Sequence, residues 1–421
     1  MKAATMDDAN ANWAGNITYG AAALHAPRSV PELQALVRKA RKVRALGSRH
    51  SFNRIADTDA DLISLKQMPR IVDMDRAART ARVDAGITYG QLSPILEAEG
   101  FALHNLASLL HISVAGAIST ATHGSGDKNK NLASSVAGLS ILKADGELVT
   151  LSRGDKDFDG AVVGLGALGI VTDITLDILP SFSLRQNLYL DLPFAAAVEN
   201  FDALFSSAYS VSFFPTWRSD VIEQVWIKSA VEMPPSPGDL FGARAADRPW
   251  HPIGAMDPTP CTEQMGIAGV WYDRLPHFRI NVTPASGHEL QSEYFVPRAD
   301  AAAAMRALYA IKEQIAEPLI VSEIRTIAAD SLWMSMGYGG DGVAFHFSWK
   351  QDWPAVKAVL PTLEAALAPF KARPHWGKLF TMPAKQLQAL YPRLADFRDL
   401  LGRTDPQGKF RNDFVDEYIF A

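Results

Sequence analysis

The stretch Arg44–Thr58, RALGSRHSFNRIADT, places one histidine among small polar residues directly after an apolar segment. An amphipathic helix is predicted just before it, since apolar side chains recur there at helical spacing. These side chains are Leu33, Leu36, Val37, Ala40 and Val43. Ser29 and Glu32 match a capping box at the start of this helix. The helix leads into a short strand and a turn at Gly47, so His50 is expected on a loop that closes a packed unit.

Length, charge and cysteine content already exclude several classes of function. A length of 421 residues predicts two or three domains. A net charge of −5 without a basic block argues against a nucleic-acid partner. The single Cys261 excludes intrachain disulfides, thiolate zinc cages and iron–sulfur clusters held by one chain, and no metal site is expected. Redox chemistry therefore needs another cofactor.

Targeting signals are not recognisable in the chain. The sequence has no run of 18 or more apolar residues, so no membrane-spanning helix is expected. The N-terminal segment MKAATMDDANANWAGN has two early aspartates and no apolar core, which argues against a secretory signal. The expected location is cytoplasmic.

The rest of the N-terminal region alternates short strands and helices. LISL, RIVDMD and ARVDAG read as strands, and a helix is predicted from a Thr88–Gln91 capping box to a stop at Gly100. The segment GLSILKADGELVTLS predicts a hairpin in which Asp145-Gly146 supplies the positive φ angles of a tight turn. Apolar and polar residues alternate over 170–178, which is typical of a half-buried strand.

A second domain is expected from about Ser181, where longer strands begin. An amphipathic helix is predicted later in it, on Met305, Leu308, Ile311 and Ile315. Residues 232–266 are rich in proline and glycine without periodicity, which predicts a long loop, either a lid or a surface excursion.

Two glycine-rich segments differ in what they predict. GLGALG, Gly164–Gly169, fits the dinucleotide pattern G-x-G-x-x-G, but a strand follows it where a helix is needed, so a Rossmann site is not predicted. The segment Leu106–Gly126, LASLLHISVAGAISTATHGSG, lets backbone amides approach a flat or phosphorylated ligand. Taken alone it is equally consistent with tight packing between elements, but with LGSRHS it suggests two halves of a cofactor cradle.

These two segments, with the stretch between them, resemble the FAD-binding domain of the vanillyl-alcohol oxidase (PCMH-type) family over most of the first 180 residues. The resemblance implies an α+β fold: a two-subdomain FAD-binding domain and an α+β cap with a mainly antiparallel sheet. The expected segments are 1–180 for the FAD-binding domain, 181–378 for the cap and 379–421 for a return to the first domain. TDPQGKFRNDFVDEYIF resembles the closing segment of sugar-acting relatives.

The resemblance also implies which residues bind FAD. In the family the histidine of GSRHS is bonded to the 8α carbon of the flavin, so His50 is the implied covalent tether. Without the family, a histidine held by hydrogen bonds would be the favoured interpretation. HIS contains no cysteine, so a single bond is implied. The other implied contacts are Ala45, Leu46, Gly47, Ser48, Arg49, Ser51, Ser108, Ser113, Gly116, Thr120, Ala121, Thr122, His123 and Ile170.

Two later strands predict a polar surface for a substrate. In PLIVSEIRTIAAD, Glu323 and Arg325 share one face, and in GVAFHFSWK, His346 and Ser348 share one face. Solvated strand faces are the commoner outcome of such alternation. The phenylalanines beside His346 argue against simple exposure there.

RPHWGKLF resembles the HWGK segment of sugar-acting family members, the aldonolactone oxidases and bacterial alditol oxidases. This implies that Ser108, Glu323, Arg325, His346 and Lys378 surround a substrate near flavin N5, with Ala107 at the position that controls oxygen access. Arg325 would hold a developing alkoxide. Lys378 is the candidate base and His346 its competitor. Glu323 would accept hydrogen bonds from outer hydroxyls of a polyol.

The predicted function is that of an FAD-dependent alditol oxidase: a terminal hydroxyl of xylitol or sorbitol becomes an aldehyde, and O2 becomes hydrogen peroxide. The expected partners are a polyol and O2, and the expected state is a monomer. The alternatives are an aldonolactone oxidase or dehydrogenase and a non-catalytic sugar- or flavin-binding protein. A metal-dependent hydrolase is disfavoured, since no H-E-x-x-H is present.

Overall fold

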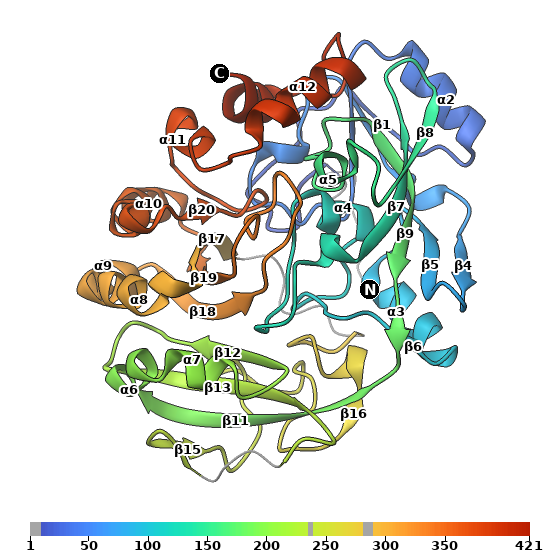
Figure 1. The fold of residues 1–421 in the computed structure, drawn as a ribbon. Coiled ribbons are helices and arrows are strands. Elements are labelled where there is room, and N and C mark those ends of the chain that lie inside the picture. Colours follow the sequence, from blue (N-terminus) through green and yellow to red (C-terminus); the bar gives the residue numbers. More distant parts are fainter. Residues whose placement is uncertain (1–9, 235–238, 281–288) are drawn as a thin grey trace.

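The computed structural model describes residues 10–234, 239–280 and 289–421. A three-stranded sheet, a five-stranded sheet and the C-terminal helices lie on one side of the molecule, and a ten-stranded sheet extends away from them (Figure 1). The α+β prediction is confirmed, because helices and strands alternate along the chain and the large sheet is antiparallel.

The loop that carries His50 connects two strands of a small parallel sheet. β1 (Ala23–His25), β3 (Asp61–Ile63) and β2 (Val43–Ala45) pair in the order β1-β3-β2, and α2 (Val30–Lys39) makes the crossover that parallel strands need. The prediction that Val43 belongs to the helix was wrong: extended backbone at Ala40 ends α2, and Val43 begins β2. Residues 45–51 therefore leave the carboxyl end of this sheet.

The start of α2 carries half of the predicted capping box. Ser29 Oγ accepts the backbone N–H of Glu32 at 3.3 Å. The Glu32 carboxylate accepts from the backbone N–H of Arg28 at 2.8 Å, one residue before the expected partner. At α3 (Tyr89–Ala98) the box is complete, since Thr88 and Gln91 bond reciprocally, and Gly100 follows the helix at φ +80°.

A five-stranded antiparallel sheet carries the second cradle segment. Its order is β4 (Val72–Asp75), β5 (Thr80–Asp84), β9 (Ile170–Asp177), β7 (Val136–Leu142) and β8 (Leu148–Ser152). The alternation predicted for β9 is confirmed except at Asp173, which is buried and accepts a hydrogen bond from Arg82 at 2.8 Å. The strand β6 (Phe101–Ala102) pairs instead with β10 (Leu179–Pro180).

The hairpin β7–β8 is confirmed, but its turn differs from the prediction. Of the five loop residues 143–147, all described, Gly146 alone has positive φ, at +81°. Gly146 N–H donates to Lys143 C=O, and Lys143 N–H donates to Glu147 C=O. A five-residue loop needs one left-handed residue, whereas a two-residue turn of the predicted type needs two.

The glycine motif Gly164–Gly169 lies between the short helix α5 (Phe158–Ala161) and β9. Helix therefore precedes it and strand follows it, which reverses the order of a dinucleotide fingerprint. The strand predicted directly after the motif is confirmed.

The large sheet is antiparallel throughout, with the order β14-β15-β11-β13-β12-β18-β19-β17-β20, and β16 also pairs with β11. Its strands are β11 (Ser183–Pro193), β12 (Ser210–Phe214), β13 (Val221–Ala230), β14 (Asp239–Leu240), β15 (Ala243–Ala245), β16 (Gly269–Val270), β17 (Glu289–Pro297), β18 (Leu319–Ile327), β19 (Gly342–Lys350) and β20 (Arg373–Pro374).

Helices cover one face of this sheet. They are α6 (Phe194–Glu199), α7 (Phe201–Phe205), α8 (Ala301–Ala310), α9 (Lys312–Ala316) and α10 (Trp353–Leu367). Phe345, Phe347 and Trp349 of β19 pack in the same core as Met305 and Leu360 of these helices. The single helix predicted over Met305–Ile315 was wrong, because Ile311 at φ −112°, ψ 17° separates α8 from α9.

The C-terminal segment returns to the first half of the chain. It comprises α11 (Ala384–Gln388), α12 (Leu394–Thr404), α13 (Asp413–Val415) and a π-helical turn over Asp416–Phe420. Phe397 and Val415 share a core with Ile174 of β9. Lys409 Nζ donates to the carbonyls of Val37 and Ala144, each at 2.8 Å.

The predicted loop 232–266 contains β14 and β15 and is otherwise irregular, and residues 235–238 lie outside the described part. It is held against the sheet, since Gln224 Nε2 donates to His251 C=O at 2.9 Å. Within the described residues, no helix is both long and apolar enough to cross a lipid bilayer.

Candidate active site

A cavity of about 540 Å³ lies between the first part of the chain and the ten-stranded sheet, since residues of both line it. Its walls come from the loop after β2, from the segment 107–123, and from one face of β17, β18 and β19. This volume is within the range of small-molecule and cofactor sites. The cavity therefore joins the two regions that the sequence suggested separately.

The loop after β2 supplies one end of the cavity. All of the predicted residues Ala45–Ser51 line it. Glycine leaves room for the Ser113 side chain at 47 and 116, because a Cβ at either position would lie 2.8 Å from Ser113 Oγ. Ser113 Oγ is buried and has no hydrogen-bond partner among the described residues. Close backbone and an unpaired buried hydroxyl fit a bound FAD.

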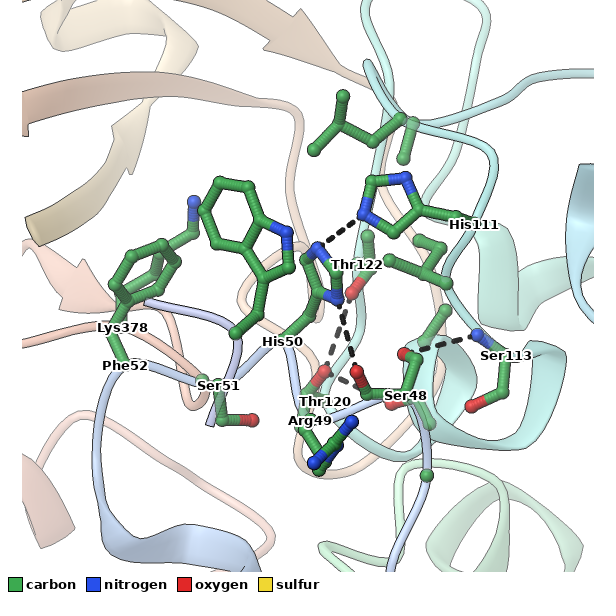
Figure 2. A pocket seen from close by; sticks show the side chains of 18 of the residues that line it. Ser48, Arg49, His50, Ser51, Phe52, His111, Ser113, Thr120, Thr122 and Lys378 are labelled. Carbon is green, nitrogen blue, oxygen red and sulfur yellow. Dashed lines mark hydrogen bonds between the residues drawn. The ribbon is translucent and has the colours of Figure 1, made fainter. Parts of the chain in front are cut away.

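His50 lies in this end of the cavity with its ring held on two sides. Trp13 stacks on it with ring centroids 4.9 Å apart, and His111 Nε2 is 2.6 Å from His50 Nε2. Figure 2 shows His111 pointing at this imidazole from the second segment. Burial, with His111 beside it, lowers the pKa of His50 to about 3. The ring is therefore neutral at pH 7 and keeps a nucleophilic lone pair.

Most of the second segment also lines the cavity, at Ser108, Ser113, Gly116, Thr120, Thr122 and His123. Ala121 and Ile170 are not among the residues that line the cavity, so their contact with FAD stays a prediction. Ala121 is fully buried in the main core at φ +54°. Ile170 packs between α2 and β2, while its neighbours Gly169 and Val171 face the cavity. Strand alternation turns the side chain at 170 to the opposite face.

The other end of the cavity is formed by adjacent strands of the large sheet. β18 and β19 are antiparallel neighbours, with Glu323 opposite His346 and Val321 opposite Ser348. Glu323, Arg325, His346 and Ser348 all line the cavity. The prediction that these four residues face a common space is confirmed. Lys378, Ala107 and Ser108 line the same cavity.

Arg325, which is buried, and Lys378, which is half-buried, are cationic residues at this end. Arg325 Nη2 donates to Glu293 Oε1 at 2.6 Å, and its Nε has no hydrogen-bond partner among the described residues. Lys378 Nζ donates to Gln291 Oε1 and lies 3.9 Å from Glu293 Oε2. Burial lowers the pKa of Lys378, and the charge of Glu293 opposes the shift.

The strand that holds these cations, β17, was not predicted to be part of the site. Glu289, Gln291 and Glu293 of β17 all face the cavity, in the alternating segment ELQSEYF. This is the same period-two signal that identified β18 and β19. It could have found Glu293, which is 1% exposed and therefore needs charged partners.

Glu293 joins the two halves of the cavity. Its Oε1 lies 3.1 Å from His123 Nε2 and 2.6 Å from Arg325 Nη2. Burial alone would raise the pKa of Glu293, but His123 and Arg325 together hold it well below its usual range. His123 Nδ1 also faces Gly124 C=O at 2.8 Å, so both ring nitrogens face acceptors.

The cavity residues that were not predicted also include Trp13, His111 and His277. His277 Nε2 lies 2.7 Å from Glu323 Oε1. Burial by itself would raise the pKa of Glu323, but Arg325 and His277 hold it below its ordinary value. The loop 232–266 adds His251, Ile253 and Met256 to the wall, so it closes part of the cavity.

The substrate end thus combines fixed cations, ionised carboxylates and a neutral histidine. Burial lowers the pKa of His346 well below its ordinary value. Its ring makes no hydrogen bond to another described residue and borders the cavity. Such a set can orient hydroxyl groups, stabilise a developing alkoxide and accept a proton.

Comparisons with known proteins agree with this geometry. The FAD binding domain family matches residues 21–152, and the D-arabinono-1,4-lactone oxidase family matches residues 283–418. The alditol oxidase of Streptomyces sp. is 45% identical over 98% of this chain and 100% of that protein. The L-gulono-1,4-lactone dehydrogenase of Mycobacterium tuberculosis is 28% identical over 96% of this chain and 97% of its own length.

A solved structure has the same fold at much lower identity. Cholesterol oxidase from B. sterolicum aligns over 97% of this chain and 96% of its own, with a TM-score of 0.79 and 15% sequence identity. The shared architecture confirms the expected two-subdomain flavoenzyme fold with a cap.

Proposed function

This chain belongs to the vanillyl-alcohol oxidase type family of FAD-dependent oxidoreductases, as a relative of bacterial alditol oxidase, and we propose that it oxidises the terminal primary hydroxyl of a polyol such as xylitol or sorbitol. The product is the aldose. When bound, FAD supplies the two-electron acceptor for the substrate hydride and passes the electrons to O2, which forms hydrogen peroxide.

The cations of the cavity hold the reacting oxygen. The free Nε of Arg325 can donate to the substrate hydroxyl and stabilise it as it loses its proton. The proton goes to Lys378 if burial keeps a useful fraction of its amine neutral, or to His346, whose ring is neutral. We retain Lys378 as the base and His346 as its competitor.

The remaining hydroxyls of a polyol fit the acceptors and donors on the same strands. Glu323 can accept hydrogen bonds from them, and Ser348 and Ser108 can both accept and donate. A site whose buried polar groups need hydroxyl partners rejects analogues that lack them. Glu323 therefore contributes to selection of a polyol over a simple alcohol.

The cofactor end is proposed to bind FAD through the loop Ala45–Ser51 and through Ser108, Ser113, Gly116, Thr120, Thr122 and His123. His50 is proposed to carry the covalent 8α bond. A neutral imidazole held in position supports this role, because only the neutral ring keeps a nitrogen lone pair that can attack the flavin. Ala107 is proposed to control oxygen access.

A second candidate is an aldonolactone oxidase or dehydrogenase, favoured by the match over residues 283–418 and by the 28% identical relative. The observation that carries the alditol proposal is the combination of the paired Glu323 and His346, on adjacent strands, with full-length 45% identity to an alditol oxidase.

Peroxide formation separates the two candidates. The purified holoenzyme is supplied with xylitol, sorbitol or L-gulono-1,4-lactone, and peroxide is measured with a peroxidase-coupled dye. We expect kcat/KM for xylitol to exceed that for the lactone by at least ~10-fold, which corresponds to about 1.4 kcal/mol. A preference for the lactone would contradict the proposal, and an Arg325→Met variant gives the background rate.

A further inference from the structure

Lys228 is a buried cation that the proposed reaction does not use. It lies on β13, is 1% exposed and does not border the cavity. Its Nζ donates to the carbonyls of Leu275 and Pro276, the latter at 3.0 Å, and lies 3.3 Å from His277 Nδ1. An ammonium group has three N–H donors, and here it faces three acceptors.

The position of Lys228 determines the tautomer of His277. Burial lowers the pKa of Lys228 to about 7, and the charge of Glu323 opposes this shift. In its ammonium form Lys228 has no lone pair, so Nδ1 accepts the hydrogen bond from it. The proton of a neutral imidazole then resides on Nε2, which lies 2.7 Å from Glu323 Oε1 and donates to it. Burial lowers the pKa of His277, which agrees with a neutral ring.

One carboxylate oxygen of Glu323 is therefore bound by His277, and the other is available to a substrate. Oε1 is occupied by His277, whereas Oε2 lies 3.6 Å from Arg325 Nε, too far for a good hydrogen bond. Both Glu323 and Arg325 border the cavity. A hydroxyl placed between them could donate to Oε2 and accept from Nε.

We propose that Lys228 and His277 are positioning residues that fix Glu323 as an acceptor for substrate hydroxyls. Lys228 holds His277 as the Nε2–H tautomer, and His277 holds the Glu323 carboxylate in its ionised form with Oε2 turned to the substrate. This inference rests on the proposed polyol function for its substrate, but its core is a proton position that can be measured without any substrate.

The kinetic test compares three variants with the wild-type holoenzyme, with bound flavin content as the check on folding. In His277→Leu the donor to Glu323 is lost, and in Lys228→Met the tautomer is no longer held. We expect KM for xylitol to rise roughly 10- to 100-fold in His277→Leu, the range for a lost hydrogen bond to a charged group. His277→Gln, whose amide can donate from the same place, should remain within about threefold of wild type.

The pH profile distinguishes positioning from packing. The groups that face Glu323 are Arg325 on its own strand, His346 on β19, His277 with Lys228 behind it, and Lys378. Removing the His277 donor raises the pKa of Glu323, so the acid limb of kcat/KM moves to higher pH in His277→Leu and returns in His277→Gln. If kcat/KM fell by the same factor at every pH in both His277→Leu and His277→Gln, the proposal would be overturned. Unchanged KM values would also overturn it.

The substrate-free test is the tautomer itself. The protein is labelled with 15N-histidine, and the His277 signals are assigned from their absence in His277→Gln. We expect an Nε2–H tautomer in the wild type and its loss in Lys228→Met. An Nδ1–H tautomer, or no change on removal of Lys228, overturns the proposal. If xylitol is not oxidised but this tautomer is found, the proposed polyol function is wrong, whereas the proposed positioning of His277 by Lys228 is supported.

Discussion

At the residue scale, the hydrogen bonds and ion pairs of Lys378 and Arg325 determine what each side chain can do in the cavity. Lys378 donates to Gln291, and its charge is opposed by Glu293 across 3.9 Å. Arg325 keeps an unpaired Nε while Glu293 holds its other end. The proposed roles of base and alkoxide holder would therefore fall to two side chains, Lys378 and Arg325, that share one carboxylate.

The proposed tether gives the first residue-scale prediction. His50→Ala removes the only proposed attachment, so flavin should be released into the supernatant by acid precipitation. In the wild type it should remain in the pellet, since a covalent bond survives denaturation. Absorbance of the two fractions checks this, and His111→Ala is a neighbouring control that keeps the imidazole at 50. Flavin that stays in the His50→Ala pellet would exclude this residue as the tether.

The proposed base, Lys378, gives the second residue-scale prediction. Lys378→Met preserves much of the volume and removes the amine, so the rate of flavin reduction by xylitol should fall by roughly 10²- to 10⁴-fold, the usual contribution of a general base. Flavin content should change far less. Anaerobic stopped-flow absorbance measures the rate, with His346→Gln as the competing variant. A normal rate in Lys378→Met would transfer the role to His346.

At the scale of elements, strand alternation sorts the large sheet into two surfaces. Phe345, Phe347 and Trp349 face the helices, whereas His346 and Ser348 face the cavity. The same rule placed Glu323 and Arg325 correctly and would also have placed Glu293. The boundary at Ile311 was not predicted, because apolar spacing continues through a break in backbone conformation.

The cradle built from two loops gives an element-scale prediction. Gly47→Val introduces a Cβ 2.8 Å from Ser113 Oγ, at a position where the backbone is proposed to approach FAD closely. We expect the ratio of flavin to protein to fall severalfold, since the substituted loop cannot close on the cofactor. Gly340→Val is the matched control, because a Cβ there meets nothing within 4 Å.

The ratio is measured from absorbance at flavin and protein wavelengths after gel filtration. Equal flavin loading in the two glycine variants would show that the loop at Gly47 does not contact the cofactor closely.

At the scale of the whole molecule, the cavity exists because two sheets from different parts of the chain face each other. Glu293 of β17 bonds to His123 of the cradle segment, 170 positions away in the sequence. We propose the division into 1–180 with 379–421 as the cofactor unit and 181–378 as the cap. The C-terminal helices share the core of the first unit, which supports this division.

The buried histidines predict how the stability of the whole protein depends on pH. His375 has its pKa lowered to about 3 by burial, and that of His346 is lowered well below its ordinary value. Below about pH 6.5 each takes up a proton when the chain unfolds but not in the folded state. This stability is fully present above about pH 6.5 and is lost as the pH falls toward the folded pKa.

We expect the free energy of unfolding of the holoenzyme to fall below pH 6.5 by up to about 1.4 kcal/mol per pH unit for each such histidine. Glu293 and Glu323, with lowered pKa values, add a further loss below about pH 4.3. Urea denaturation at pH 7.5, 6.5 and 5.5 measures this. His375→Asn should make the slope shallower, and identical free energies at the three values would contradict the prediction.

The sequence by itself determined the local features: the capping box at Thr88, the side chains that share a face of β18 and β19, and the loop that carries His50. These follow from interactions within a few residues, where spacing alone decides which side chains lie together.

Tertiary structure alone decided which charges became partners. Glu293 with His123, and Lys228 with His277 and Glu323, come from strands and loops far apart in the chain. A buried charge is stable when its hydrogen-bond partners are in place. Those partners depend on sheet order and register, which no local pattern contains.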